Sequence, residues 1–218
     1  RIKDSLRFTE FTAKASVAFE MLAGETGETF AKIRNIFQLN QQQLELTSDA
    51  ANHLSNNMAA KAPEILTFLK RAGGAAPMRG PSAAQMAALG AAIVATGTAP
   101  EIAARATNAM GNRFYQNTKK INGAFHQLGL SRKAFIKSLK KDGPAAIKKL
   151  FKLIAKHKNK EQILGDLVGM DFTDDLSKVL NNLGLLEQAY GLVSDKAKYG
   201  GSVLKEYGVR AQTTDYNI

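Results

Sequence analysis

The chain has 218 residues, which is enough for one helical domain or two small ones, and its 44% hydrophobic and 22% charged residues are typical of a folded protein. It has no cysteine, which excludes a disulfide framework, a thiol nucleophile and a zinc site with sulfur ligands. Its net charge of +11 directs attention to anionic partners.

The start of the sequence bears on whether the chain is complete, and its most apolar run bears on whether it spans a membrane. The sequence begins at Arg1 rather than Met and shows no signal peptide, so we expect a fragment of a longer polypeptide. The apolar run within Met86–Ala99 is far shorter than the ~20 residues that span a bilayer. It predicts a buried, Ala-rich helix.

Apolar residues recur at helical spacing from the start of the chain, and no stretch alternates as a β-strand does. Four early stripes predict helices within Leu6–Leu22, Phe30–Phe37, Leu44–Leu54 and Ile65–Leu69. Gly24 and Gly27 predict the break between the first two helices. We therefore predict an all-α fold: a compact multi-helix domain of roughly ten to twelve short helices, without β-sheet.

The strongest loop signal is the Gly- and Pro-rich stretch Gly73–Pro81. It predicts an N-terminal helical subdomain, residues 1–74, and a C-terminal helical subdomain, residues 82–218, unless the two form one continuous domain. The region Ser82–Met110 is rich in Ala and Gly, whose small side chains let helix axes approach closely, and it predicts a tightly packed helical hairpin.

Helix-start signals follow this loop. Ser82 with Gln85, and Thr98 with Glu101, each have the spacing of a capping box, in which two side chains satisfy backbone N–H groups at a helix start. Pro100 and Pro144 are predicted in first turns, where the missing N–H costs nothing.

The positive charge lies in one block. Residues 113–160 contain fourteen Lys and Arg and a single acid, Asp142, a net charge of +13, whereas the rest of the chain carries 16 bases against 18 acids. Two amphipathic helices in 131–160 present this charge opposite apolar stripes. The candidate anion- or DNA-contacting residues are Arg132, Lys133, Lys137, Lys140, Lys141, Lys148, Lys149, Lys152 and Lys156.

Three interpretations of this block stay open. It is a solvated helix face, the usual role of lysine runs; or it contacts nucleic-acid phosphates without reading bases; or it docks on an acidic protein or anionic lipid. Phe114, Tyr115 and Phe125 lie at its edge and fit either base stacking or a hydrophobic core, of which their spacing favours the core.

The sequence lacks the common signatures of catalysis. It has no phosphate-binding G-x-x-x-x-G-K-[ST] loop, no G-x-S-x-G nucleophile elbow and no H-E-x-x-H zinc helix. His53, His126 and His157 are far apart, and Asp171, Asp174 and Asp175 precede an apolar stripe, where acids stabilise a helix N-terminus. We predict no enzyme, no catalytic residue, no cofactor, no metal site and no small-molecule substrate.

Four phrases, in order and suitably spaced, resemble the core region of bacteriophage tail tape-measure proteins, and together they span about Asn52 to Thr214. They are NHLSNNMAAKAPEILTFLKRAG (Asn52–Gly73), SAAQMAALGAAIVATGTAPEIAARA (Ser82–Ala106), LGDLVGMDFTDDLSKVL (Leu164–Leu180) and GGSVLKEYGVRAQTT (Gly200–Thr214).

This resemblance implies a structural role in a phage or prophage virion tail. Tape-measure proteins lie in the lumen of the tail tube, set its length and are expelled ahead of the DNA during infection. It implies as partners the tail tube protein, tail assembly chaperones and tail tip proteins, with assembly in the host cytoplasm. Self-association and contact with the DNA phosphate backbone are further expectations. The family offers no shared catalytic residue to transfer.

The glycine and proline breaks bear on how such a chain would measure length. One continuous helix of 218 residues would reach about 330 Å at ~1.5 Å per residue. The breaks instead predict a compact module, with the length-measuring coiled coil outside it. The alternative function is a non-sequence-specific DNA-binding module that uses residues 131–160.

Overall fold

The computed structural model describes residues 2–72 and 80–215, and within them the chain is helical throughout, without a strand. The all-α prediction is confirmed. There are more helices than the ten to twelve expected, because several are too short to show a periodic stripe. The helices are α1 (Ile2–Phe19), α2 (Ala23–Phe37), α3 (Gln41–Asn57), α4 (Ala62–Ala72), α5 (Ala83–Val94), α6 (Pro100–Tyr115), α7 (Lys119–Gln127), α8 (Arg132–Lys141), α9 (Gly143–Lys156), α10 (Lys160–Val168), the 3-10 turn η1 (Met170–Phe172), α11 (Thr173–Leu180), α12 (Leu183–Leu192), α13 (Lys196–Tyr199) and α14 (Ser202–Asp215).

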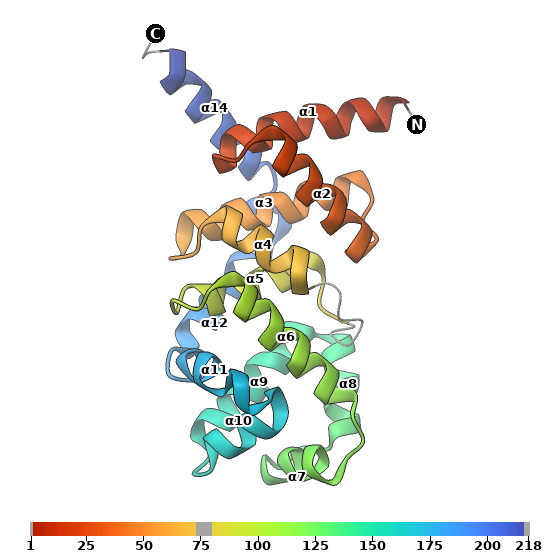
Figure 1. Ribbon diagram of the computed structural model, residues 1–218, viewed down its shortest axis with the longest axis vertical. Helices are drawn as coiled ribbons and strands as arrows, with labels where there is room; N and C mark the ends of the chain where they lie inside the picture. Colours follow the sequence, from red (N-terminus) through yellow and green to blue (C-terminus); the bar gives the residue numbers. More distant parts are fainter. Residues whose placement is uncertain (1, 73–79, 216–218) are drawn as a thin grey trace.

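The molecule is an elongated stack of helices (Figure 1). Helices α1, α2 and α14 form its upper end, α3, α4 and α5 its middle, and α7 to α10 its lower end. The chain runs down the stack and returns through α11 and α12, so that α14 packs against α1 and α3. The first and last helices, α1 and α14, therefore both lie at the upper end.

The break between the first two helices differs from the prediction. Gly24 and Gly27 do not separate the two helices, because both lie inside α2. The turn occurs earlier, at Glu20, whose backbone adopts a φ of 54°. The helix therefore ends through a left-handed residue that is not glycine, which is uncommon and gives no sequence signal.

Helix α5 is the centre of the stack. It begins with the predicted capping box: Ser82 accepts a hydrogen bond from the Gln85 N–H, and the Gln85 side chain accepts one from the Ser82 N–H. Every residue of α5 except Gln85 is buried. The helix contacts α3, α4, α6, α11 and α12. The Ala/Gly-rich region was predicted to form a helical hairpin, and its two helices, α5 and α6, do contact each other. However, α5 is a core helix that also contacts four other helices.

The closest approach to α5 occurs at Gly90. A Cβ atom on Gly90 would lie 2.3 Å from Cδ1 of Phe68 on α4, a distance that real Cβ atoms do not reach. Phe68 is itself fully buried. The α4–α5 contact therefore requires glycine at this position.

The second predicted capping box does not form. Ala99, not Thr98, is the N-cap residue of α6, and Pro100 occupies the first turn as predicted. The Thr98 hydroxyl instead lies 3.3 Å from Oδ1 of Asp175, at the start of α11. A contact between residues 77 positions apart satisfies the hydroxyl, and the local pattern gave no sign of it.

Two polar side chains of α3 hold the start of α14. Asp49 accepts hydrogen bonds from the backbone N–H groups of Gly201 (2.8 Å) and Val203 (2.9 Å). Asn52 donates to the Ser202 carbonyl and hydroxyl oxygens. Burial raises the pKa of the Asp49 carboxyl, against the effect of these two N–H donors. The last helix is thereby fixed to the middle of the stack.

The subdomain division stays a prediction. Most of the predicted boundary, Gly73–Pro81, lies outside the described residues. One continuous hydrophobic cluster includes side chains from both predicted parts, from Phe11 to Val203.

We predict that Gly90→Ala destabilises the fold by about 1–3 kcal/mol, because the added methyl overlaps the Phe68 ring in a packed core. Urea unfolding followed by circular dichroism measures this. Gly123→Ala in α7 is the matched control: a Cβ there meets nothing within 4 Å, so stability should hold or rise by a few tenths of a kcal/mol to about 1 kcal/mol. Equal effects of the two substitutions would contradict the packing account.

Candidate anion-binding surface

Helices α8 and α9 carry the predicted basic residues and meet without an intervening loop. Ser131 caps α8 by accepting a hydrogen bond from the Ala134 N–H (3.4 Å). Asp142 ends α8 and also caps α9, where it accepts from the Ala145 N–H (3.0 Å). The single acid of the basic block is therefore used to join the two helices.

The α8–α9 junction packs closely against the chain that leads into α5. A Cβ on Gly80 would lie 2.2 Å from the Leu139 carbonyl oxygen, and one on Gly143 would lie 2.6 Å from Cγ of Pro81. Gly80 also has a φ of 144°, which favours glycine. These contacts fix the position of the basic helices relative to the central helix.

The aromatic residues at the edge of the basic block belong to the core. Phe114, Phe125 and Phe135 are buried and form a cluster with ring centroids 4.9 to 6.0 Å apart. Tyr115 is partly buried and packs against the same core. The core interpretation is confirmed for Phe114 and Phe125, because neither ring is accessible to a base.

Arg132 is held by the protein itself. Its guanidinium donates to the Phe114 carbonyl oxygen (3.1 Å), to Oδ1 of Asn122 (3.0 Å) and to Oδ1 of Asn117 (3.3 Å). It joins the start of α8 to the end of α6, to the loop that follows α6 and to α7. Because its guanidinium donates to these three acceptors, Arg132 acts as a structural clamp that holds these segments together.

The lysines divide into two sets. Lys152 forms an ion pair with Glu187 of α12 (2.5 Å), which lowers the pKa of that carboxyl, and the half-buried Lys148 lies nearby. The others are exposed and make neither an ion pair nor a side-chain hydrogen bond within residues 2–72 and 80–215. These unpaired lysines are Lys133, Lys137, Lys140, Lys141, Lys149 and Lys156.

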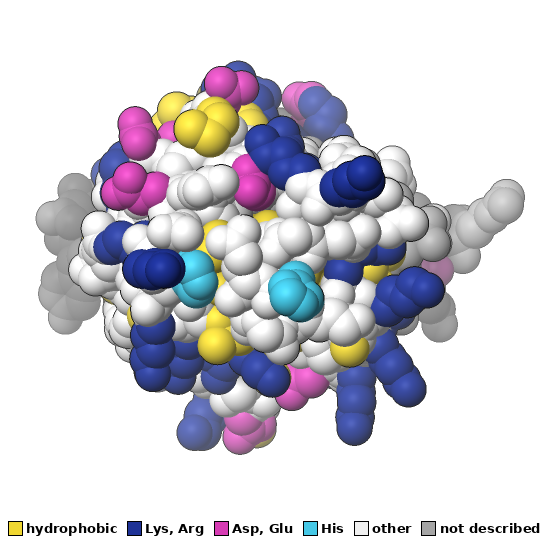
Figure 2. Space-filling view, turned by 90° about the horizontal axis from the view of Figure 1, so that it is seen from below, with side chains coloured by type: hydrophobic (Ala, Val, Ile, Leu, Met, Phe, Trp, Pro, Cys, Tyr) yellow, Lys and Arg dark blue, Asp and Glu magenta, His cyan; other side chains and the backbone are white. Residues whose placement is uncertain are grey.

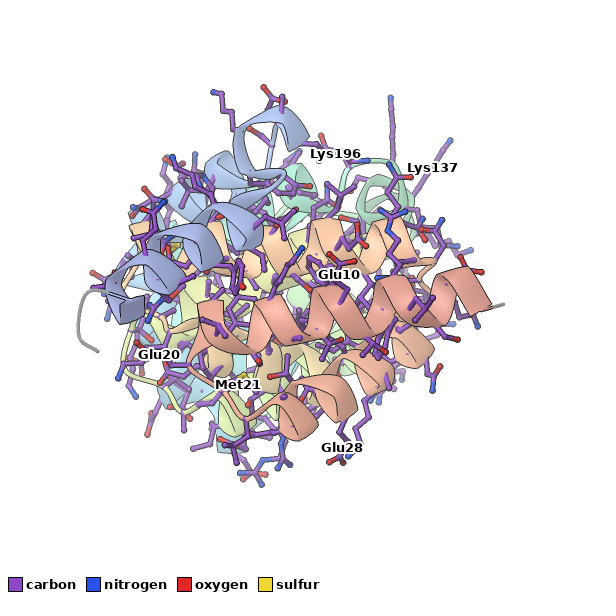
Figure 3. All side chains as sticks on the ribbon, turned by 90° about the horizontal axis from the view of Figure 1, so that it is seen from above. Glu10, Glu20, Met21, Glu28, Lys137 and Lys196 are labelled. Atoms are coloured by element: carbon purple, nitrogen blue, oxygen red, sulfur yellow. The ribbon has the colours of Figure 1, made fainter. Side chains whose placement is uncertain are left out.

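The two ends of the molecule differ in how their charged side chains are paired. At the lower end, Lys and Arg side chains stand out around much of the rim (Figure 2). At the upper end, Glu10, Glu20 and Glu28 lie on or beside α1 and α2 (Figure 3) and pair with Lys14, Arg210 and Lys32. The six unpaired lysines of α8 and α9 thus differ from the three bases named at the upper end, each of which has an acidic partner.

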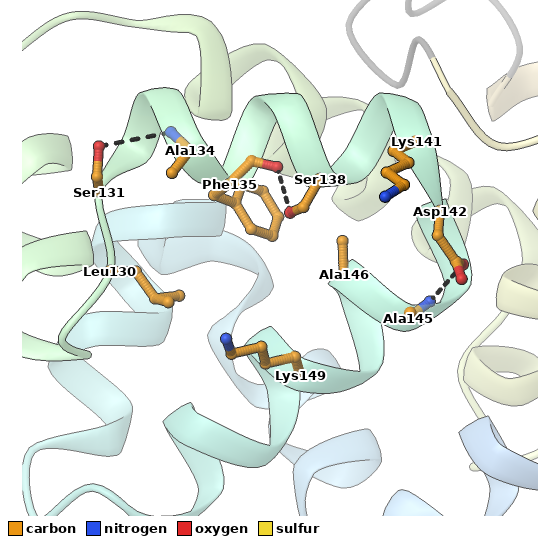
Figure 4. A pocket seen from close by; sticks show the side chains of 10 residues that line it. All are labelled: Leu130, Ser131, Ala134, Phe135, Ser138, Lys141, Asp142, Ala145, Ala146 and Lys149. Atoms are coloured by element: carbon orange, nitrogen blue, oxygen red, sulfur yellow. Dashed lines mark hydrogen bonds between the residues drawn. The ribbon is translucent and has the colours of Figure 1, made fainter.

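A groove of about 500 Å³ opens between α8 and α9 (Figure 4). Its apolar surface comes from Leu130, Ala134, Phe135, Ala145 and Ala146. Lys141 on α8 and Lys149 on α9 stand on opposite walls (Figure 4). We call this feature the α8–α9 groove; the sequence did not predict it, because it depends on the angle at which the two helices diverge from Asp142.

The acids singled out in the sequence lie at or before the start of one helix. Asp174 and Asp175 lie in the first turn of α11, as predicted, and Asp171 lies in η1. The described part of the chain contains no group of three or more His, Asp or Glu side chains that would hold a metal ion.

Comparison with known proteins identifies the family. The profile of the phage-related minor tail proteins matches residues 2–169. The chain belongs to this phage minor tail protein family. It is also 32% identical, over 225 residues, to a probable tape measure protein of Halomonas phage phiHAP-1. The predicted resemblance to tape-measure proteins is confirmed.

The alignment with that phage protein covers 100% of this chain and 26% of the relative, so the minor tail protein chain spans about a quarter of the length of the curated relative it matches. No solved structure matches this chain. Among the described helices, none has the length and apolar character needed to cross a membrane.

We predict that Arg132→Ala lowers the stability of this minor tail protein by about 1–3 kcal/mol, because the Phe114 carbonyl and the two asparagines lose a charged donor. Chemical unfolding measures the loss. Lys133→Ala, the adjacent exposed residue, removes the same charge and should change stability by less than about 0.5 kcal/mol. If the two variants are equally stable, Arg132 is not a clamp.

Proposed function

We propose that this chain is a folded module of a tape-measure protein, a structural component of a phage or prophage tail that acts by assembly and not by catalysis. The observation that carries the proposal is the similarity to a probable tape measure protein along the whole chain. Its membership of the phage minor tail proteins supports the same role.

In this role the parent protein lies in the lumen of the tail tube, helps to set tail length and leaves the virion with the DNA. The partners we propose are the tube protein, the assembly chaperones and the tip proteins. Because the chain aligns with only 26% of its relative, most of such a protein lies elsewhere.

The packing supports a particular division of labour within the parent protein. A ruler gains most length per residue from an extended helix, at ~1.5 Å each. This module instead folds back on itself, with α14 packed against α1 and α5 enclosed by five other helices. We therefore propose that the length-measuring coiled coil lies outside it.

The test is an in-frame duplication of this module in the parent gene, with tail length measured by electron microscopy. Tails should form and lengthen by far less than the ~330 Å expected if the second copy were an extended helix. Deleting an equal number of residues from a coiled-coil segment of the parent is the matched control and should shorten tails by about 330 Å.

An increase near 330 Å on duplication would contradict the compact module. Normal tail number and length after complete deletion of the module would contradict its role in tail assembly.

A second candidate function is contact with DNA phosphates during ejection. Six unpaired, exposed lysines on two adjacent helices support it, because their clustering favours counterion release from DNA. The buried phenylalanines and the engaged Arg132 leave lysine ammonium groups as the contacting chemistry, which suits the phosphate backbone rather than base edges.

For this second function we predict submicromolar binding of labelled duplex DNA at low salt, weakening steeply as salt rises. Changing Lys133, Lys137, Lys140 and Lys156 to Glu should abolish it. Changing Lys61, Lys196, Lys198 and Lys205 to Glu alters the net charge equally and should leave most of the binding. Fluorescence anisotropy at several salt concentrations measures both variants. No binding at low salt, or equal loss in both, would contradict a defined phosphate-contacting surface.

A further inference from the structure

The α8–α9 groove is apolar and concave, which would not be expected if these helices only presented lysines to solvent. Its floor is apolar and open to solvent, with Ala134 and Ala145 exposed on opposite walls. Exposed apolar surface that is concave and rimmed by charge is typical of binding sites. The groove thus differs from the rest of the α8 surface, where Lys133, Lys137 and Lys140 lie outside the lining.

The polar groups of the groove are satisfied within the protein, apart from two lysines. The Ser131 hydroxyl caps α8, and the Ser138 hydroxyl donates to the Phe135 carbonyl oxygen (2.7 Å). The Asp142 carboxylate accepts from the Ala145 N–H. Lys141 and Lys149 have no acidic partner in the described part of the chain. A ligand therefore meets apolar surface and two ammonium groups.

The spacing of the lining residues matches a third helix laid along the groove. On α8 the lining positions are 131, 134, 135, 138 and 141, and on α9 they are 142, 145, 146 and 149. Each set is one i, i+3, i+4, i+7 stripe, the surface that a helix presents to another helix. Small residues on both walls let a third helix axis come close.

Charge decides what kind of helix fits. The surrounding block carries +13, and the one carboxylate in the groove is already engaged as a cap. An incoming helix with acidic residues beside its apolar stripe would pair them with Lys141 and Lys149 while its apolar side chains cover the floor. A DNA backbone has no apolar face to cover it.

From this geometry we propose that the α8–α9 groove is a docking site for an acidic amphipathic helix of a partner protein. The mode is helix-in-groove recognition, with apolar anchors at helical spacing and carboxylates on the two lysines. This inference goes beyond the proposed tail role and does not depend on it. It uses lysines other than the four whose reversal tests DNA binding.

The probe is a fluorescein-labelled helical peptide of about 14 residues, roughly four turns, with Leu and Ala on one stripe and Glu on both sides of it. We expect binding to the intact chain in the micromolar range at physiological salt, measured by anisotropy. Two control peptides, one with the same composition in scrambled order and one with Lys in place of Glu, should bind at least ~10-fold more weakly.

Three variants of the chain locate the site. Lys141→Glu with Lys149→Glu should weaken binding at least ~10-fold, whereas Lys133→Glu with Lys137→Glu, an equal charge change outside the groove, should weaken it less than ~3-fold. Ala134→Gln with Ala145→Gln alters exposed positions of the two walls without changing charge and should weaken binding ~5-fold or more. Circular dichroism confirms that each variant folds.

Several outcomes would overturn the proposal. Equal losses in the two lysine pairs, with the Ala-to-Gln variant unaffected, would show non-specific attraction between charges. So would displacement of the peptide by excess duplex DNA from intact chain and groove variant alike. No peptide binding up to millimolar concentration, or binding of anionic lipid vesicles in its place, would also exclude this partner. Failure here leaves the tail-length experiment unaffected.

Discussion

The contact between Phe68 and Gly90 is the constraint on which the rest of the arrangement depends. A glycine at this point lets α4 reach α5 at a distance that a single methyl group would prevent. Alanines along the rest of α5 let α3, α6, α11 and α12 approach its other sides. A central helix of small residues thus becomes the common neighbour of elements from the beginning, middle and end of the chain. The continuous hydrophobic cluster follows from that.

The basic block has too few acids of its own to pair with its lysines. Between residues 113 and 160 there is one acid, and it caps α9, so lysines there find partners only where the fold brings acids from elsewhere. Glu187 meets Lys152 and Asp166 meets Lys120 in this way. The six unpaired lysines of α8 and α9 face solvent or the α8–α9 groove. DNA contact and helix docking both draw on this excess, but the substitutions that test them change different lysines.

Most features set by local pattern were predictable from the sequence, whereas the left-handed turn at Glu20 and the features set by distant contacts were not. The helical class, the Ser82 capping box and the first-turn prolines depend on neighbouring residues, and each is confirmed. Thr98 and Arg132 look like a cap and a surface base, but their partners lie 77 and 18 residues away, at Asp175 and Phe114. For the same reason, the composition located the basic block without separating paired from unpaired lysines or revealing the groove.

The central claim is that this stretch of a phage tail protein is a compact module organised around α5. Small-angle X-ray scattering of the purified chain tests it most directly. The packing predicts a radius of gyration moderately above the ~17 Å expected for a near-spherical chain of 218 residues, because the stack is elongated, and far below the ~50 Å of an unfolded chain. A value near 50 Å, as for an unfolded chain of this length, or the scattering of a long rod, would contradict it.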